Sequence, residues 1–130
     1  MEIQQARFVL RAKSFDATTR FYGEALGLPR MSSWESEEER GATFQAGPAV
    51  IEVLGRPGRD LGDLRDEIYE YHGPQQKLVL AFLVPSAQKT FEEIQFRERN
   101  IPGGLRRGAD GVLLFDTHDP DGVKILFREG

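Results

Sequence analysis

The sequence contains no cysteine and only two histidines, His72 and His118, among its 130 residues. The absence of cysteine excludes disulfide frameworks, thiolate nucleophiles and cysteine-based zinc or iron–sulfur sites. Two histidines are too few for a metal site built from several imidazoles. No apolar run approaches the roughly 20 residues that a membrane-spanning helix needs. Since the first residues also lack the pattern of a signal peptide, we expect a cytoplasmic protein with no membrane partner.

Basic residues are also in the minority, with 17 Lys and Arg against 21 Asp and Glu and a net charge of −4. This balance disfavours nucleic acid as a partner. The mean hydropathy of −0.45 is typical of a globular protein. A chain of this length buries enough surface to fold as one domain without a disulfide or a structural metal.

The first half of the chain predicts one strand, one helix and three further strands. Alternation of Phe8, Leu10 and Ala12 with charged or apolar neighbours indicates the first strand. Asp16 is a good N-cap for the helix, and Gly27 is expected to end it. The acidic run 35–39 is expected at a solvated hairpin tip. The predicted strands are 3–12, 30–34, 41–45 and 49–54.

The second half repeats this order, with helix starts about seventy residues apart. Ser86 is the expected N-cap of its helix, and Asn100 a plausible left-handed residue at its end. The predicted strands are 78–84, 105–107, 112–117 and 123–128. Between the halves the chain is loop-like, with a possible short helix at 63–71. We therefore expect a single domain, 1–130, with modules at about 1–55 and 77–130 and a linker at about 56–76.

Two motifs resemble the glyoxalase/bleomycin-resistance/dioxygenase (vicinal oxygen chelate) superfamily. They are FYGEALGL at 21–28, directly after a predicted strand, and the turn DPDG at 119–122 before the last strand. The resemblance implies an α+β fold in which two tandem βαβββ modules form a curved mixed-sheet cup. It specifies the fold and leaves the activity open.

Metal-dependent members of that family place their ligands on the first and fourth strands of each module. Carried onto this sequence, the four positions are Arg7, Glu52, Val79 and Leu126. Only Glu52 among them can bind a hard cation, whereas such sites need three or more oxygen or nitrogen ligands. We therefore predict no metal and no cofactor. A divalent metal remains the alternative if a different register recruits Gln5 or His118.

Period-2 alternation independently assigns residues to the cup. If Phe8 and Leu10 pack under the first helix and Ile51 and Val53 are core, their neighbours face the other way. Apolar walls with a few oriented polar groups are typical of a small-molecule pocket. The predicted ligand-binding residues are Arg7, Val9, Arg11, Val50, Glu52, Leu54, Val79, Ala81, Leu83, Lys124 and Leu126, with Trp34 from a module edge.

Several of these residues have more than one interpretation. Glu52 is either a catalytic base, or a metal ligand, or a carboxylate paired with Arg7 across the cup. Arg7 and Arg11 either recognise a ligand carboxylate or phosphate or form structural salt bridges. Trp34 either contributes to a dimer contact or ligand cleft, or is simply half-buried. We interpret His118 as solvent-exposed and His72 as part of the linker.

Three functions remain open from the sequence. We favour a metal-free small-molecule-binding protein, similar in kind to the bleomycin-resistance proteins and, like them, a homodimer with a small organic ligand as its partner. The basic residues of the cup suit an anionic or neutral ligand. The alternative is a glyoxalase-like lyase, epimerase or dioxygenase that uses Glu52 as base or metal ligand. The third is an interaction module whose cup is filled by side chains.

Overall fold

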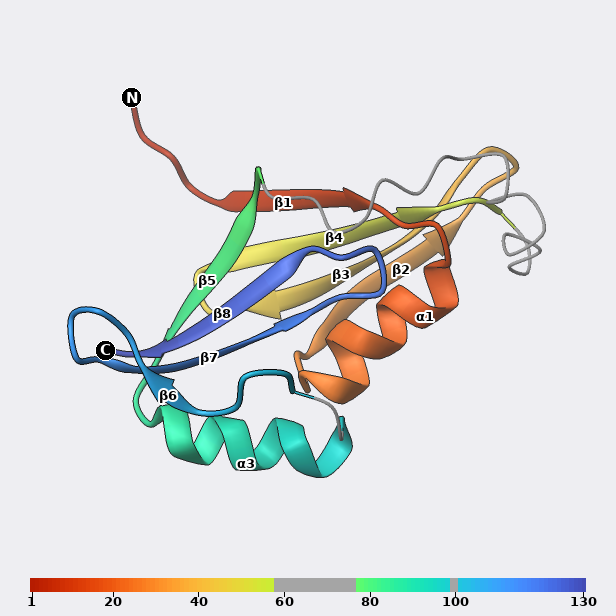
Figure 1. The fold of residues 1–130 in the computed structure, drawn as a ribbon. Helices are drawn as coiled ribbons and strands as arrows, with labels where there is room; N and C mark the ends of the chain where they lie inside the picture. Colours follow the sequence, from red (N-terminus) through yellow and green to blue (C-terminus); the bar gives the residue numbers. More distant parts are fainter. Residues whose placement is uncertain (58–76, 99–100) are drawn as a thin grey trace. The chain divides into compact units, whose positions relative to one another are not determined.

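Two four-stranded mixed sheets, each with a helical layer on one face, form the framework of the protein (Figure 1). The computed structural model describes residues 1–57, 77–98 and 101–130. The chain divides into two compact units, Met1–Tyr71 and His72–Gly130. The predicted α+β class is confirmed.

The N-terminal unit has the strand order β1-β4-β3-β2, in which β1 runs parallel to β4 and the other pairs are antiparallel. Its elements are β1 (Ala6–Arg11), α1 (Phe15–Arg20), the π-helical turn η1 (Phe21–Ala25), β2 (Arg30–Glu35), β3 (Arg40–Ala46) and β4 (Ala49–Gly55).

The first helix begins two residues earlier than the sequence predicts. Ser14 is the N-cap, and its hydroxyl accepts a hydrogen bond of 3.2 Å from the backbone N–H of Ala17. The prediction that Asp16 is the cap is wrong. Asp16 lies in the first turn, where its negative charge suits the positive end of the helix. Gly27 follows the helical segment with φ of 75°, the left-handed conformation expected of a helix stop.

The core of the N-terminal unit lies between the helical segment and the sheet. Tyr22 and Phe44 are fully buried, with ring centroids 6.4 Å apart, and Ile51 and Val53 are buried beside them. Phe8 lies on the same face of the sheet as Ile51 by strand register, as expected, but its side chain is 37% exposed. The reason is that β1 is an edge strand, whereas α1 packs against β4.

The C-terminal unit repeats the same topology in the order β5-β8-β7-β6, with β5 parallel to β8. Its elements are β5 (Val79–Val84), α3 (Ala87–Arg97), β6 (Arg106–Arg107), β7 (Leu113–His118) and β8 (Lys124–Glu129). Ser86 caps α3 as predicted, because its hydroxyl accepts a hydrogen bond from the backbone N–H of Lys89. The carboxylate of Glu129 accepts a second bond from the N–H of Ala87, which ties the helix start to β8.

Aromatic rings fill the core of the C-terminal unit. Phe115 is fully buried; its ring stacks on Phe127 at 4.9 Å and meets Phe91 of α3 edge-on at 5.2 Å. These contacts define the face of the sheet that α3 covers.

The predicted strands agree with the observed ones to within a few residues at each end. The possible helix at 63–71, Asn100 and His72 lie outside the described residues. No helix in the described part of the chain is long and apolar enough to cross a membrane.

Candidate functional site

All the residues predicted for the ligand site in the N-terminal unit lie on one face of its sheet. Arg7 pairs with Val50, Val9 with Glu52 and Arg11 with Leu54. Residues opposite each other on neighbouring strands point to the same face. Trp34 joins them because it pairs with Gly41, which in turn pairs with Leu54. This face is opposite the one that buries Phe44 and Ile51 against the helical segment.

Arg7 and Glu52 form an ion pair on this face. The guanidinium Nη1 of Arg7 donates to the Oε1 of Glu52 at 2.7 Å, and its Nη2 donates to the Oε1 of Gln5 at 3.0 Å. The side chain of Glu52 is 16% exposed and that of Arg7 is 44% exposed. The pairing of Glu52 with Arg7, one of the three interpretations from the sequence, is therefore present in the structure. A role for Glu52 as a catalytic base stays a prediction.

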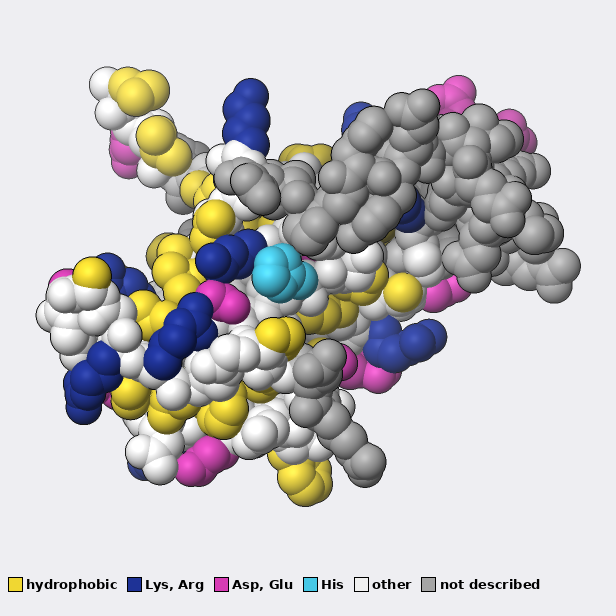
Figure 2. All heavy atoms as spheres, in the orientation of Figure 1, with side chains coloured by type: hydrophobic (Ala, Val, Ile, Leu, Met, Phe, Trp, Pro, Cys, Tyr) yellow, Lys and Arg dark blue, Asp and Glu magenta, His cyan; other side chains and the backbone are white. Residues whose placement is uncertain are grey.

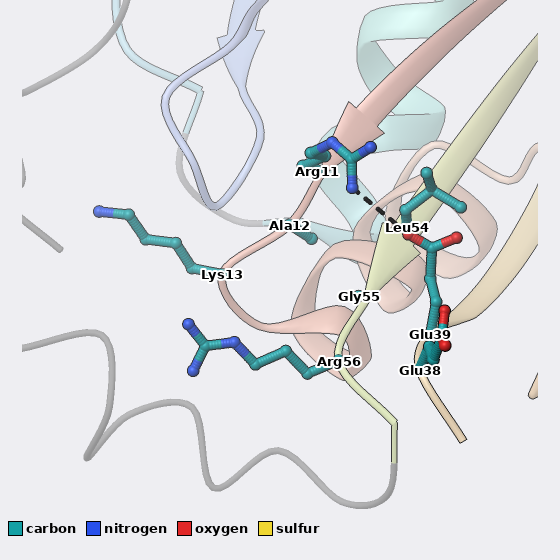
Figure 3. Close-up of a pocket in the computed structure, with 8 residues that line it drawn as sticks. All are labelled: Arg11, Ala12, Lys13, Glu38, Glu39, Leu54, Gly55 and Arg56. Atoms are coloured by element: carbon teal, nitrogen blue, oxygen red, sulfur yellow. Dashed lines mark hydrogen bonds and ion pairs between the residues drawn. The ribbon is translucent and has the colours of Figure 1, made fainter. Parts of the chain in front are cut away.

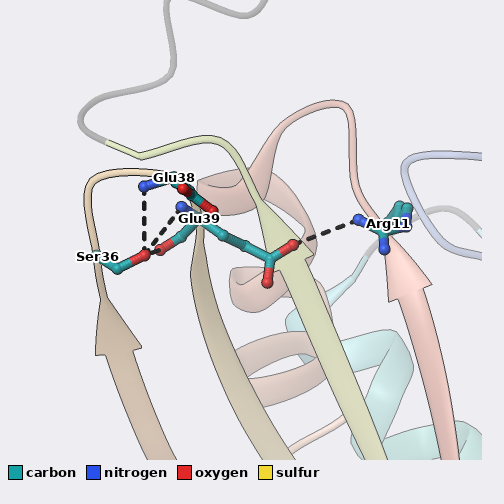
Figure 4. A network of polar contacts seen from close by, with 4 residues as sticks. All are labelled: Arg11, Ser36, Glu38 and Glu39. Atoms are coloured by element: carbon teal, nitrogen blue, oxygen red, sulfur yellow. Dashed lines mark hydrogen bonds and ion pairs between the residues drawn. The ribbon is translucent and has the colours of Figure 1, made fainter.

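A second ion pair lies at the end of β1. The guanidinium of Arg11 donates to the carboxylate of Glu39 at 3.3 Å. The hydroxyl of Ser36 holds the acidic turn that carries Glu39, because it accepts bonds from the N–H groups of Glu38 and Glu39 and donates to the carbonyl of Glu39 (Figure 4). The turn thus brings a carboxylate from the β2–β3 hairpin to the end of β1.

A pocket of about 420 Å³ opens beside this second ion pair (Figure 3). Arg11 and Leu54, both predicted from the sequence, line it. Figure 3 shows Lys13 and Arg56 extending in the same direction from the two chain segments that follow β1 and β4. The described residues that line it are Arg11, Ala12, Lys13, Glu38, Glu39, Leu54, Gly55 and Arg56. Three cations and two carboxylates leave the lining with a formal positive charge.

The remaining predicted residues of this face differ in exposure. Val50 and Leu54 are buried, and Val9 is half-exposed. Trp34 is also half-exposed, and its ring lies directly over the backbone of Gly41. The apolar side chains thus flank the polar groups of Arg7, Glu52 and Arg11 on the same face.

In the C-terminal unit the predicted residues also share one face. Val79 pairs with Lys124, Ala81 with Leu126 and Leu83 with Arg128, and the face they form is opposite the one that buries Phe115 and Phe127. By strand register, Arg7 corresponds to Val79 and Glu52 to Leu126. The hydrogen-bonding register thus places Arg7 and Glu52 of the first module at the same positions as Val79 and Leu126 of the second.

A polar cluster on this second face was not predicted from the sequence. The guanidinium Nη2 of Arg106 donates to the Oδ2 of Asp116 at 2.6 Å, and the Nζ of Lys124 lies 3.5 Å from the same oxygen. The signal that could have found it is the single charged residue, Asp116, inside the predicted apolar strand 112–117. Unpaired buried carboxylates are costly, so this position calls for a cation nearby.

A further ion pair lies next to this cluster. The N–H of Val112 and the guanidinium of Arg128, at 2.7 Å, both contact the carboxylate of Asp110. The hydrogen bond from Val112 and the charge of Arg128 lower the pKa of Asp110 from its ordinary value of 3.8.

The donor set does not match a metal site of the kind found in metal-dependent relatives. Within the described ranges, no three His, Cys, Asp or Glu side chains gather in a group that could hold an ion. Of the four positions carried over from the family, only Glu52 is a carboxylate, and it is bonded to Arg7. These residues do not fit a divalent metal.

Two βαβββ units of identical strand order, each with a charged and apolar face opposite its helix, define a tandem-repeat α+β protein. The family model of the Glyoxalase/Bleomycin resistance protein/Dioxygenase superfamily matches residues 4–127. The chain belongs to that superfamily.

Solved structures show the same fold at low sequence identity. A glyoxalase family protein from Enterococcus faecalis is 19% identical, with a TM-score of 0.67 over 98% of this chain and 97% of that one. A glyoxalase-related enzyme from Fulvimarina pelagi is 18% identical, with a TM-score of 0.67 over 96% and 86%. A glyoxalase I mutant from Zea mays is 19% identical, with a TM-score of 0.73 over 94% of this chain and 43% of that one. A search of curated protein sequences finds no match.

Proposed function

We propose that this chain is a metal-free member of the superfamily that binds a small organic anion or neutral molecule. The ligand lies on the Arg7–Glu52 face of the N-terminal sheet, in and beside the pocket at the end of β1 and β4. The dimer and the participation of the second module in one cup, both implied by the resemblance, stay predictions.

The observation that carries the proposal is the pocket itself. Its volume of about 420 Å³ is in the range of small-molecule sites, roughly 300–1,000 Å³. The guanidinium of Arg11 suits a carboxylate or phosphate because its planar fork can donate two parallel hydrogen bonds. Leu54 and the neighbouring Val9 offer apolar contact to the rest of the ligand. One cation for the charged part of a ligand and apolar side chains for the rest are the groups that a small-molecule-binding protein uses.

The test begins with a thermal-shift screen of bleomycin, glutathione thioesters and aromatic acids. A true ligand at about a hundredfold its Kd stabilises the fold by about 2.7 kcal/mol. For an anionic hit, we expect Arg11→Met to weaken binding by about tenfold or more, because it removes a charge-assisted hydrogen bond. Isothermal titration calorimetry measures the change. Arg11→Met is the preferred variant because its partner, Glu39, is exposed enough to remain solvated.

Arg107→Met is the matched control, since Arg107 is an exposed arginine of the C-terminal unit whose guanidinium bonds the carbonyl of Gly111. It should bind the same ligand as the parent does. Arg7→Met leaves the carboxylate of Glu52 without its partner, so the double variant Arg7→Met/Glu52→Leu accompanies it. If both Arg11→Met and this double variant retain full affinity for the anionic hit, the proposed site is wrong.

An enzyme that uses Glu52 as a base is the second candidate. The observation in its favour is a carboxylate that is mostly buried on the ligand face. Glu52→Gln separates the two functions once a ligand is known. Binding without conversion in the parent favours the binding protein, whereas turnover that Glu52→Gln abolishes while affinity persists favours the enzyme.

We expect the purified protein to contain far less than one divalent metal ion per chain. The physical reason is that Glu52 is the single metal-binding side chain at the four positions carried over from the family. Elemental analysis of protein purified without chelator measures this, and dialysis against EDTA should leave the unfolding temperature unchanged. A stoichiometric metal, or a clear loss of stability in EDTA, would overturn the metal-free proposal.

A further inference from the structure

We propose that the N-terminal unit carries a second binding site, for a small amino dicarboxylate such as L-glutamate, on the helix-covered side of its sheet. A pocket of about 500 Å³ opens there, and residues of α1, η1, β2 and β3 line it. The pocket lies on the opposite side of the sheet from the Arg7–Glu52 face. The proposal does not depend on the function proposed for that face.

A β-bulge brings Arg30 to this side of the sheet. Arg30 pairs with Phe44, whereas Ser32, two residues further along β2, pairs with Thr43. Neighbouring residues of β3 point to opposite faces, so Arg30 shares the helix side with Phe44. Ser32 points to the other side, where its hydroxyl lies 2.6 Å from that of Thr43. Regular alternation would place Arg30 with Ser32, and bulges often redirect a side chain in this way next to active sites.

Two guanidinium groups of this pocket are available to an anion. That of Arg30 lies 5.3 Å from the ring centroid of the buried Phe44, which orients it in the pocket. Arg20, the last residue of α1, lines the same pocket. In the part of the chain that the structure describes, neither guanidinium forms an ion pair. Each can therefore bind a carboxylate through two parallel hydrogen bonds.

A carboxylate on η1 supplies the opposite charge. Glu24 is exposed and lies four residues after Arg20, a spacing at which side chains of an α-helix pair. The chain forms a π-helical turn here, and no Arg20–Glu24 ion pair is present among the described residues. Gly23, in the same turn, leaves space beside Phe44, since a Cβ there would lie 3.0 Å from a ring carbon. Glu24 thus remains available to a ligand ammonium group.

The charges of the pocket specify the class of ligand. Asp16, the second acid of the lining, lies 3.6 Å from the guanidinium of Arg40, with which it forms a neutral pair. Two guanidinium groups and the carboxylate of Glu24 then leave a formal charge of +1. An amino dicarboxylate offers the complementary set, two carboxylates and one ammonium group. Figure 2 shows acidic and basic side chains next to one another over the helical segment that Figure 1 labels α1.

The experiment titrates the full ¹⁵N-labelled chain with L-glutamate, L-glutamine and glutarate, followed by NMR chemical shifts. We expect L-glutamate to shift the amides of Arg20, Glu24 and Arg30. L-Glutamine lacks one carboxylate and glutarate lacks the ammonium group, so each should bind at least about tenfold more weakly. The affinity for L-glutamate should fall as NaCl is raised toward about 1 M, because salt screens exposed charges.

Three variants test the assigned groups. Arg30→Met should raise the Kd for L-glutamate by about tenfold or more. Arg107→Met makes the same chemical change on an exposed arginine of the C-terminal unit and should leave the Kd within a factor of about two. Glu24→Gln should reduce the preference for L-glutamate over glutarate to about twofold or less, because the ammonium group loses its charged partner.

Several results would overturn the proposal. They are L-glutamine or glutarate binding as tightly as L-glutamate, shifts that are absent or confined to the Arg7–Glu52 face, and an unchanged Kd in Arg30→Met. An undiminished preference for L-glutamate over glutarate in Glu24→Gln overturns the assignment of the ammonium group. Arg11→Met should leave L-glutamate binding unchanged, so failure of the function proposed for the Arg7–Glu52 face is distinguishable from failure of this one.

Discussion

Phe115→Ala is expected to lower the free energy of unfolding by about 3–5 kcal/mol, the usual cost of removing a fully buried aromatic side chain. Phe115 has no exposed surface; it stacks on Phe127 and meets Phe91 edge-on. Its removal leaves a cavity between α3 and the sheet and also loses both ring–ring contacts. Urea denaturation followed by far-UV circular dichroism measures the change.

Phe96→Ala is the matched control for this prediction. Phe96 lies on α3 and is 88% exposed, so the same truncation there should change stability by no more than about 0.5 kcal/mol. Equal losses in the two variants would contradict the core assignment.

Gly55→Ala is expected to cost about 1–3 kcal/mol, as overpacking of a well-filled core does. A Cβ at Gly55 would lie 2.6 Å from the Cβ of Phe15. That atom is bonded to the backbone at the start of α1, so the clash can be relieved only by moving the helix or β4. The ring of Phe15 also has a second neighbour, because the guanidinium of Arg40 lies over it at 4.5 Å from its centroid. Thermal and urea denaturation measure the loss.

Gly41→Ala provides the comparison. A Cβ there would overlap the outer ring atoms of Trp34, which is half-exposed on the edge strand β2 and can swing into solvent. We expect a loss below about 1 kcal/mol, together with a change in fluorescence, since Trp34 is the single tryptophan of the chain. A larger loss in Gly41→Ala than in Gly55→Ala would show that the ring of Trp34 is fixed and the start of α1 is adaptable.

Much of the candidate site could be predicted because strand alternation is a local property. Arg7, Glu52 and Arg11 were assigned to one face from the spacing of their neighbours, and the observed ladders place them there. Phe8 lies on the expected face but stays 37% exposed, for a related reason. Alternation says which residues share a face, but not whether a strand lies at the centre or the edge of the sheet.

The cluster of Arg106, Asp116 and Lys124 shows where prediction from sequence stops. Neither Arg106 nor Asp116 is among the site residues predicted from the sequence. The three residues come together because the turn between β6 and β7 sets Arg106 opposite Leu114, and because β7 pairs with β8 in one register. A shift of that register by one residue would send Asp116 to the opposite face of its strand.

The sequence by itself determined the repeated βαβββ order, the family and which residues share the strand face opposite each helix, since hydrophobic period and turn motifs are encoded over a few residues. It also determined how few metal ligands the chain offers, since it holds no cysteine and two histidines. The tertiary structure alone decided which charges pair. Glu52 bonds Arg7, Glu39 reaches Arg11, and Asp116 gathers two cations. Ion pairs over such separations depend on register and turn geometry, which are fixed only when the whole sheet forms.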